Sequence, residues 1–121
     1  MTPISVPAEA AAYELAVVTL YVDMPETPSH ATTGDQAQAR RWFQAGVPLR
    51  VVETALLLAT VRRLTRPPEA LPLAAIRSLA YFEPVVAELL EIPVSDGYRR
   101  YLQHKLQSYL HARAGVPTSS S

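Results

Sequence analysis

The chain contains no cysteine, which excludes a disulfide framework, a thiolate nucleophile and a cysteine-based zinc site. No apolar run reaches the roughly 18 residues that a membrane span requires. The first residues also lack the basic segment and apolar stretch of a signal peptide. Neither sign of charge is in excess, because eleven Lys and Arg balance eleven Asp and Glu. These absences lead us to expect a cytoplasmic protein that does not use a membrane.

Apolar residues are plentiful, at 49% of a chain of 121 residues. The bulk of the sequence is therefore too apolar to stay disordered, and its length suits one domain. Glycine occurs only four times, whereas alanine and leucine, which favour helices, are abundant. The sequence predicts an all-α fold, a compact single-domain bundle of five or six helices without a sheet.

The first expected helix spans about residues 7–23. Its apolar side chains cover nearly all sides, which is typical of a helix that is central or lies in an interface. Residues 17–22 also have strand propensity, so a strand is the alternative there. A polar loop is expected at 25–32.

Two further helices are expected to meet near Gly46. Thr33 and Gln36 have the spacing of a capping box, which predicts the start of the second helix. Gly46 suits the left-handed position that ends this helix, and Pro48 suits the first turn of the next. This third helix extends to about Thr65. Because it is apolar on all sides, we expect it to be the centre of the bundle.

Prolines delimit the second half of the chain. After a stiff connector at 66–72, a short helix is expected over about 73–82. The residue before a proline disfavours helical geometry, so we expect a break at Glu83 and a new helix as far as Glu91.

The last helix is expected to be capped by Ser95 or Asp96 and to end near Ala114. We expect the single domain, 1–121, to be ordered over about 7–114, with a mobile tail at 115–121. The predicted core consists of Val52, Leu56, Ala59, Leu79, Phe82, Val86 and Leu90.

The residues that could carry out catalysis do not form a recognisable set. His104 and His111 are seven residues apart on one helix, which separates them by roughly 10 Å, too far for one metal ion. His30 lies in the polar loop. Glu88 and Glu91 share a helix face, but such pairs are usually solvated surface charge. We therefore expect no enzymatic activity, no catalytic residue, no cofactor and no metal.

Charge is distributed unevenly along the chain. Residues 1–39 contain five acids and no base, whereas residues 40–121 contain all eleven bases and six acids. This asymmetry indicates either a basic face for nucleic acid or an acidic segment that packs against a basic one. The sequence leaves both interpretations open.

Aromatic and basic residues alternate along the last helix. At 100° per residue, one side carries Tyr98, Tyr101, Leu102, Lys105, Leu106 and Tyr109, and the other carries Arg99, Arg100, Gln103, His104, Gln107 and His111. The first side is either a core-packed stripe along which Lys105 extends to solvent, or a surface on which tyrosines stack with bases. The candidate nucleic-acid-binding residues are Tyr81, Tyr98, Arg99, Arg100, Tyr101, Lys105 and Tyr109.

The third helix raises two questions about DNA. Its end carries three arginines, which either extend the candidate surface or interact with the helix dipole: Arg62, Arg63 and Arg66. Residues 39–57 also have the outline of a helix-turn-helix motif. However, bulky Trp42 occupies the close crossing, and the leucines at 56–58 cannot recognise base edges. These features argue against that motif.

One set of residues resembles a known family. Trp42, Gly46, the stretch 47–59 (VPLRVVETALLLA) and residues 81–85 (YFEPV) resemble the helical module of DnaD-type primosomal proteins. Similar modules end plasmid and phage replication initiators. The resemblance covers about residues 36–91 and implies a helical accessory domain in DNA replication.

The family has a Tyr-x-x-x-Ile-x-x-x-Trp segment that is associated with DNA binding. In this chain Tyr81 matches, Val85 replaces the isoleucine, and Leu89 stands where the tryptophan belongs. Pro84 inside the segment is a further departure.

Two functional hypotheses follow. The first is a non-catalytic helical accessory module that binds nucleic acid in the replication or maintenance of a mobile genetic element. The alternative is a protein-interaction or self-associating module without nucleic-acid binding, with a homodimer or protein partner held through the first helix.

Overall fold

The computed structural model describes residues 8–113, so the expected tail at 115–121 and the ends predicted at residues 7 and 114 lie outside the described residues. The described part contains five α-helices, one 3₁₀ turn and no β-strand. The all-α prediction is confirmed. The elements are α1 (Ala8–Asp23), α2 (Thr33–Gln44), α3 (Leu49–Leu64), η1 (Leu79–Phe82), α4 (Glu83–Glu91) and α5 (Asp96–Arg113).

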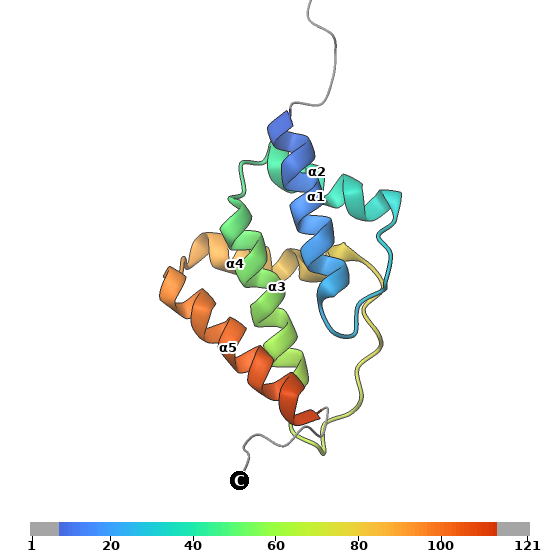
Figure 1. The fold of residues 1–121 in the computed structure, drawn as a ribbon, viewed down its shortest axis with the longest axis vertical. Helices are drawn as coiled ribbons and strands as arrows, with labels where there is room; N and C mark the ends of the chain where they lie inside the picture. The colour runs from blue at the N-terminus through green and yellow to red at the C-terminus, as the bar shows by residue number, and fades with distance from the viewer. Residues whose placement is uncertain (1–7, 114–121) are drawn as a thin grey trace, which may run out of the picture.

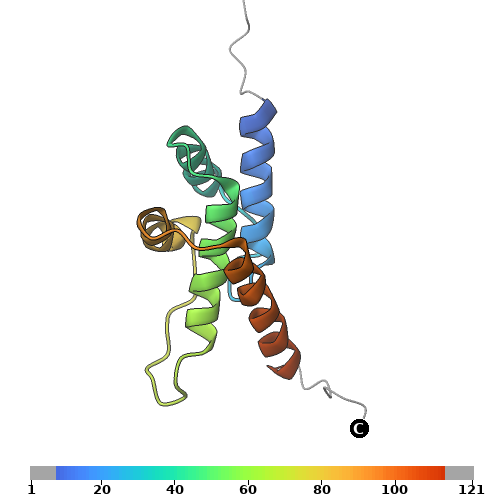
Figure 2. The ribbon, with the colours of Figure 1, turned by 90° about the vertical axis from the view of Figure 1, so that its left-hand side faces the viewer.

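Helix α3 lies in the middle of the bundle. It contacts α1, α4, α5 and η1 (Figure 1). Seen from the side, α1 and α5 lie on one side of α3, and α2 and α4 lie on the other (Figure 2). Every residue from Thr54 to Val61 is buried, which matches a helix that is apolar all round. The prediction of a central third helix is confirmed.

Helix α1 packs with one face only. Ala10, Tyr13, Val17 and Tyr21 are buried at helical spacing, while Leu15 on the opposite face is 68% exposed. Residues 17–22 continue this helix, so the strand alternative was wrong. Packing against α2 and α3 overrides the strand propensity of the valines.

The capping box of α2 lies one residue earlier than predicted. Thr32, not Thr33, is the N-cap, and its hydroxyl accepts from the Asp35 N–H at 3.1 Å. Asp35, not Gln36, completes the box, because its carboxylate accepts a hydrogen bond from the Thr32 N–H at 2.9 Å. The other oxygen of Asp35 accepts from the Leu79 N–H at 2.9 Å. The carboxylate is 2% exposed, so the tertiary bond to Leu79 fixes the register of the cap.

The turn between α2 and α3 forms as the sequence predicts. Gly46 has φ of +78°, the left-handed conformation that glycine adopts without strain. Pro48 is the N-cap of α3, one position before the first turn. The Val47 N–H bonds to the Trp42 carbonyl at 2.9 Å, which closes the turn.

The helix expected at 73–82 was wrong over most of its length. Only Leu79–Phe82 forms a turn, and it is 3₁₀. Figure 1 shows the preceding segment running from the end of α3 back along the molecule to η1. An extended residue covers about 3.3 Å against 1.5 Å in a helix, so this span favours extended chain. Buried Ile76, 3% exposed, anchors the segment.

Helix α4 begins at Glu83 with Pro84 in its first turn, which confirms the expected break. The Glu83 carboxylate accepts bonds from Gln38 Nε2 and Trp42 Nε1, and these bonds tie α4 to α2.

One predicted core residue was assigned wrongly. Leu90 is 48% exposed, whereas its neighbour Leu89 is 4% exposed. Val86 and Leu89 are the buried residues of α4, and Leu90, 100° round the helix from Leu89, lies beyond Val86 at the exposed edge of this face. The other predicted core residues are buried: Val52, Leu56, Ala59, Leu79, Phe82 and Val86.

Two buried tyrosines of α1 differ in one hydrogen bond. We therefore expect their phenylalanine variants to change the free energy of unfolding differently. Tyr13 Oη donates to the Val47 carbonyl at 2.8 Å, whereas Tyr21 Oη has no partner among the described residues. Tyr13→Phe leaves that carbonyl unpaired and should lower the free energy of unfolding by about 1–3 kcal/mol. Tyr21→Phe removes an unsatisfied hydroxyl and should leave stability unchanged or raise it. Urea unfolding at pH 7 measures both.

The same variants provide an alkaline control. Burial raises the pKa of both Tyr13 and Tyr21 to about 12, from an ordinary value of 10.0. Between these values the unfolded chain loses protons that the folded chain keeps, so wild-type stability should fall as pH rises from about 10 to 12. Each phenylalanine variant removes one such group, so it should lose less stability than the wild type over this pH range. A steeper fall in either variant would contradict this assignment.

Candidate nucleic-acid interface

A hollow of about 330 Å³ lies at the C-terminal end of α3, and residues of α3, η1 and α4 contribute to its lining. Its lining is both basic and aromatic. It consists of Ala59, Arg62, Arg63, Arg66, Leu73, Tyr81 and Val85. Arg62 and Arg63 of α3, Arg66 just after it, and the predicted binding residue Tyr81 therefore line one hollow.

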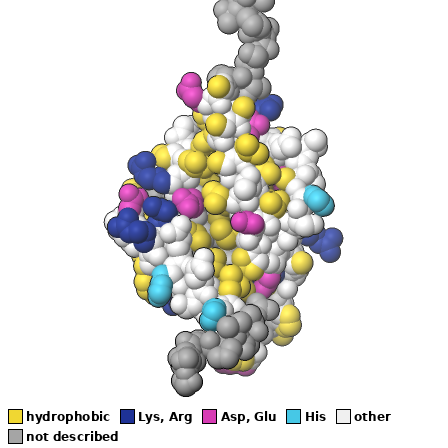
Figure 3. Space-filling model, in the orientation of Figure 1, with side chains coloured by type: hydrophobic (Ala, Val, Ile, Leu, Met, Phe, Trp, Pro, Cys, Tyr) yellow, Lys and Arg dark blue, Asp and Glu magenta, His cyan; other side chains and the backbone are white. Residues whose placement is uncertain are grey.

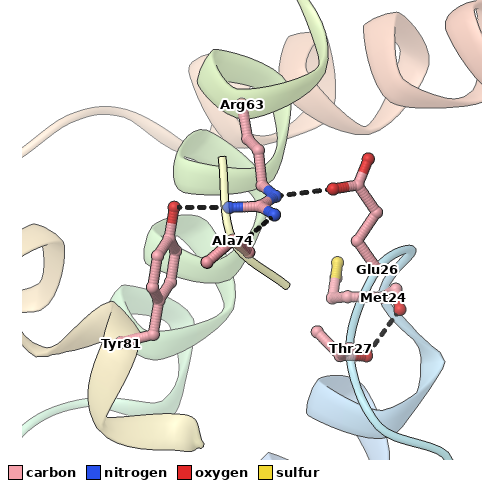
Figure 4. A network of polar contacts seen from close by, with 6 residues as sticks. All are labelled: Met24, Glu26, Thr27, Arg63, Ala74 and Tyr81. Atoms are coloured by element: carbon pink, nitrogen blue, oxygen red, sulfur yellow. Dashed lines mark hydrogen bonds and ion pairs between the residues drawn. The ribbon is translucent and has the colours of Figure 1, made fainter. Parts of the chain in front are cut away.

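Arg63 is the buried member of this set, with its side chain only 5% exposed. Nε pairs with Glu26 at 2.6 Å, Nη2 donates to the Ala74 carbonyl, and Nη1 lies 3.4 Å from Tyr81 Oη (Figure 4). Its guanidinium also lies 5.7 Å from the centre of the Tyr81 ring. Every nitrogen is thus engaged within the protein. Arg63 positions Tyr81 and is not free to bind a ligand.

Glu26 reaches Arg63 from the loop after α1. It has φ of 68°, a conformation that costs a non-glycine residue free energy. Thr27 Oγ1 holds the loop by donating to the carbonyls of Tyr21 and Met24, at 2.8 and 2.6 Å. Figure 4 shows the bond to Met24 beside Glu26. The fixed loop offsets this strain and directs the carboxylate to the arginine.

Arg62 lines the hollow and pairs with α4. Its side chain is 52% exposed and forms two hydrogen bonds to Glu88, at 2.9 and 2.7 Å. These bonds raise the pKa of Arg62 above its ordinary value, and the nearby Tyr98 hydroxyl adds to the increase. Because Glu88 belongs to α4, this ion pair ties the end of α3 to α4.

The exposed edge of α5 continues from Tyr98. The rings of Tyr98 and Tyr101 are stacked with centroids 5.9 Å apart. Lys105 Nζ lies 5.8 Å from the centre of the Tyr101 ring. Tyr101 is 53% exposed and Tyr81 is 41% exposed, so both present rings to solvent. We call this set the tyrosine–arginine surface. It consists of Arg62, Arg66, Tyr81, Tyr98, Tyr101 and Lys105.

The seven predicted binding residues are not all in one place: Tyr81 lies in the hollow with Arg62 and Arg66, whereas Tyr98, Tyr101 and Lys105 follow one another on α5. Tyr109 is partly buried and, together with Arg63 and Arg66, lines a second hollow of about 560 Å³. Arg99 faces α3, where it pairs with Glu53 at 3.5 Å. Arg100 is exposed, but on the edge of α5 opposite Tyr101 and Lys105.

The predicted division of α5 into an aromatic and a polar side was partly wrong. Leu102 and Leu106 are buried as expected, but Tyr101 and Lys105 are exposed. Arg99, assigned to the outer side, turns toward α3 because Glu53 offers it a partner, and Gln103 donates to the same carboxylate at 3.3 Å. The Lys105 side chain lies over an exposed ring and not over the core.

Ion pairs account for part of the charge asymmetry. Arg40 pairs with Glu14 at 2.9 Å, and Arg63 pairs with Glu26. Both join the acidic segment 1–39 to the basic remainder. The interpretation of an acidic segment packed on a basic one thus has direct support at these two contacts.

The other sequence candidates occupy ordinary positions. His104 and His111 are exposed, and across residues 8–113 no three histidine or acidic side chains lie close enough together to hold a metal ion. No helix in the described part of the chain is long and apolar enough to span a membrane. The leucines at 56–58 are buried, so α3 has no free face to place in a DNA groove. Leu89, which stands at the tryptophan position of the DnaD-type segment, is also in the core.

Comparison with models of known protein families, with curated proteins and with solved structures finds no match to this chain.

Proposed function

We propose that this chain is a non-catalytic helical module that binds nucleic acid through the tyrosine–arginine surface. Two observations support the proposal: Tyr81 lies in a hollow with Arg62 and Arg66, and the stacked rings of Tyr98 and Tyr101 lie beside Lys105 on α5. Such rings stack with bases of any sequence, and neighbouring Arg and Lys side chains contact phosphates. Sequence-tolerant stacking needs unpaired bases, so single-stranded nucleic acid is the favoured class.

The role in replication or maintenance of a mobile genetic element is part of the same proposal. Its support is the resemblance of residues 36–91 to DnaD-type modules. Tyr81, the matching residue of the DNA-associated segment, is exposed, and Val85 lines the same hollow.

Titration of labelled single- and double-stranded oligonucleotides at two salt concentrations tests this function. Affinity should fall as salt rises, because phosphate contacts release counterions. Tyr101→Ala should cost about 1–3 kcal/mol of binding free energy through one lost stack. Lys105→Ala should weaken binding several-fold and reduce the salt slope by about one phosphate.

Arg100→Ala is the matched control, because it also removes one positive charge from α5 but from the opposite edge. It should leave affinity nearly unchanged. Equal losses of affinity for Arg100→Ala and Lys105→Ala would show that any positive charge on α5 attracts nucleic acid. The tyrosine–arginine surface would then not be a defined binding site. Absence of binding to either oligonucleotide would overturn the proposed function.

A second candidate function, a protein-interaction module, is favoured by one specific observation. The outer face of α1 is apolar, with Leu15 at 68% exposure, although its inner face already fills the core. This observation is independent of the tyrosine–arginine surface, so the two functions do not compete for the same residues.

A further inference from the structure

Basic side chains of this protein lie next to acidic ones. The chain has eleven residues of each sign, and at the left of Figure 3 Lys and Arg side chains lie beside Asp and Glu side chains. A phosphate group that approaches such a surface competes with the protein's own carboxylates for the cations. The ion pair that gives way to phosphate is expected to be one that solvent already reaches.

The ion pair of Arg62 with Glu88 is open to solvent on both sides. Its two side chains are 52% and 41% exposed. The other ion pairs described above each have a more enclosed partner: Glu14 at 13%, Arg63 at 5% and Arg99 at 22% exposure. An exposed pair is weak, because water can solvate both charges separately. Arg62 and Glu88 can therefore separate easily, whereas the buried Arg63 cannot leave its partners.

The geometry of this pair matches the way in which arginine binds a phosphate. Arg62 Nη1 donates to one oxygen of Glu88 at 2.9 Å, and Nη2 donates to the other oxygen at 2.7 Å. Arginine uses the same two parallel hydrogen bonds to hold a carboxylate or a phosphate. The carboxylate of Glu88 thus occupies the place that two phosphate oxygens would take.

Arg62 also lies beside an exposed aromatic ring. It lines the same hollow as Tyr81 and Arg66, whereas Glu88 is not among the residues that line it. A base that stacks on Tyr81 belongs to a strand with a phosphate on either side of it. Arg62 is therefore placed to bind one of these phosphates once Glu88 has left.

We propose that Arg62 binds a backbone phosphate of the nucleic acid, and that this phosphate displaces the Glu88 carboxylate from the guanidinium. The proposal rests on the proposed function and deepens it, because it names a residue that lowers the affinity of the binding surface. Two hydrogen bonds to Glu88 must break before Arg62 can form two to the phosphate. Glu88 therefore opposes binding although it touches no ligand in the complex.

Glu88→Gln tests the proposal on the full chain, by titration of a labelled single-stranded oligonucleotide. Loss of the carboxylate should free Arg62 and raise the affinity about two- to fivefold. Glu91→Gln is the matched control, because it removes the same charge one turn further along α4. Glu91 is exposed and forms no ion pair with another residue between 8 and 113. Its substitution should have a smaller effect, since it acts only through screened repulsion.

A double variant separates displacement from general repulsion. In an Arg62→Ala background, Glu88→Gln should raise the affinity no more than Glu91→Gln does, because there is no guanidinium left to free. A full gain in that background would overturn the proposal, as would equal gains for Glu88→Gln and Glu91→Gln in the wild-type background. Circular dichroism verifies that each variant folds.

Inorganic phosphate tests whether the occupant is a strand. Added at constant ionic strength, it should displace the oligonucleotide no better than chloride does. Stronger displacement by phosphate would make a free phosphate compound the occupant of Arg62 and overturn the proposal. Failure of the proposed function is distinguishable: wild-type protein that binds no oligonucleotide overturns both. Binding that depends on Tyr101 and Lys105 but is unchanged by Glu88→Gln overturns only the role of Glu88 and Arg62.

Discussion

Leu56→Ala is expected to lower the free energy of unfolding by about 2–5 kcal/mol. Leu56 is fully buried at the middle of α3, the helix that contacts three other helices. Truncation removes buried methyl groups and leaves a cavity. The central helix cannot close this cavity by moving toward one neighbouring helix, because it would lose contact with another. Urea denaturation followed by circular dichroism measures the loss.

Leu90→Ala is the matched control for this experiment. Because Leu90 is about half exposed and alanine favours helices, the same truncation should cost less than about 1 kcal/mol. Losses of similar size in the two variants would show that Leu90 also belongs to the core, contrary to the rotation of α4 described above.

Asp35→Ala is expected to cost about 2–4 kcal/mol. One oxygen of this buried carboxylate caps α2 through the Thr32 N–H, and losing such a cap costs about 1 kcal/mol. The other oxygen accepts from the Leu79 N–H, and leaving that buried donor unpaired costs about 1–3 kcal/mol more. Thermal and urea unfolding of the variant measure the total.

Gln36→Ala distinguishes the observed cap from the one expected from the sequence. Gln36 is exposed and takes no part in the capping box, so its loss should be within about 0.5 kcal/mol. Asp35→Asn should fall between the two, because the amide retains one acceptor oxygen for two donors. A Gln36→Ala loss equal to that of Asp35→Ala would contradict the assignment.

Local signals in the sequence were sufficient for most of the fold. Gly46 and Pro84 mark a helix end and a helix start through backbone geometry alone. Apolar side chains on all sides of the helix at 49–64 predict that this helix is central. The wrong predictions concern segments whose conformation depends on residues far away in the sequence. Residues 73–78 have helical composition, but the distance from α3 to η1 requires an extended chain. The register of the α2 cap depends on Leu79, which is 44 residues away.

The candidate site was predictable in its exposed rings but not in its support. Tyr81, Tyr101 and Lys105 stand out by residue type and spacing. Glu26 gives no local sign of its role, because its partner Arg63 is 37 residues away and its positive φ is not evident from the residue itself. The sequence also could not distinguish Arg63, which is buried, from Arg66, which is exposed.

The extended connector between α3 and η1 determines where the chain can change in length. Residues 67–69 and 71–73 are exposed, and only one backbone hydrogen bond, from the Ala70 N–H to the Pro67 carbonyl, forms within them. The entropy of closing a loop grows with the logarithm of its length, so doubling this segment costs only about 0.6 kcal/mol. The turn at Gly46 has no such freedom, because Val47 is bonded to both Trp42 and Tyr13. Insertions are therefore expected to be tolerated ahead of Ala74 but not between α2 and α3.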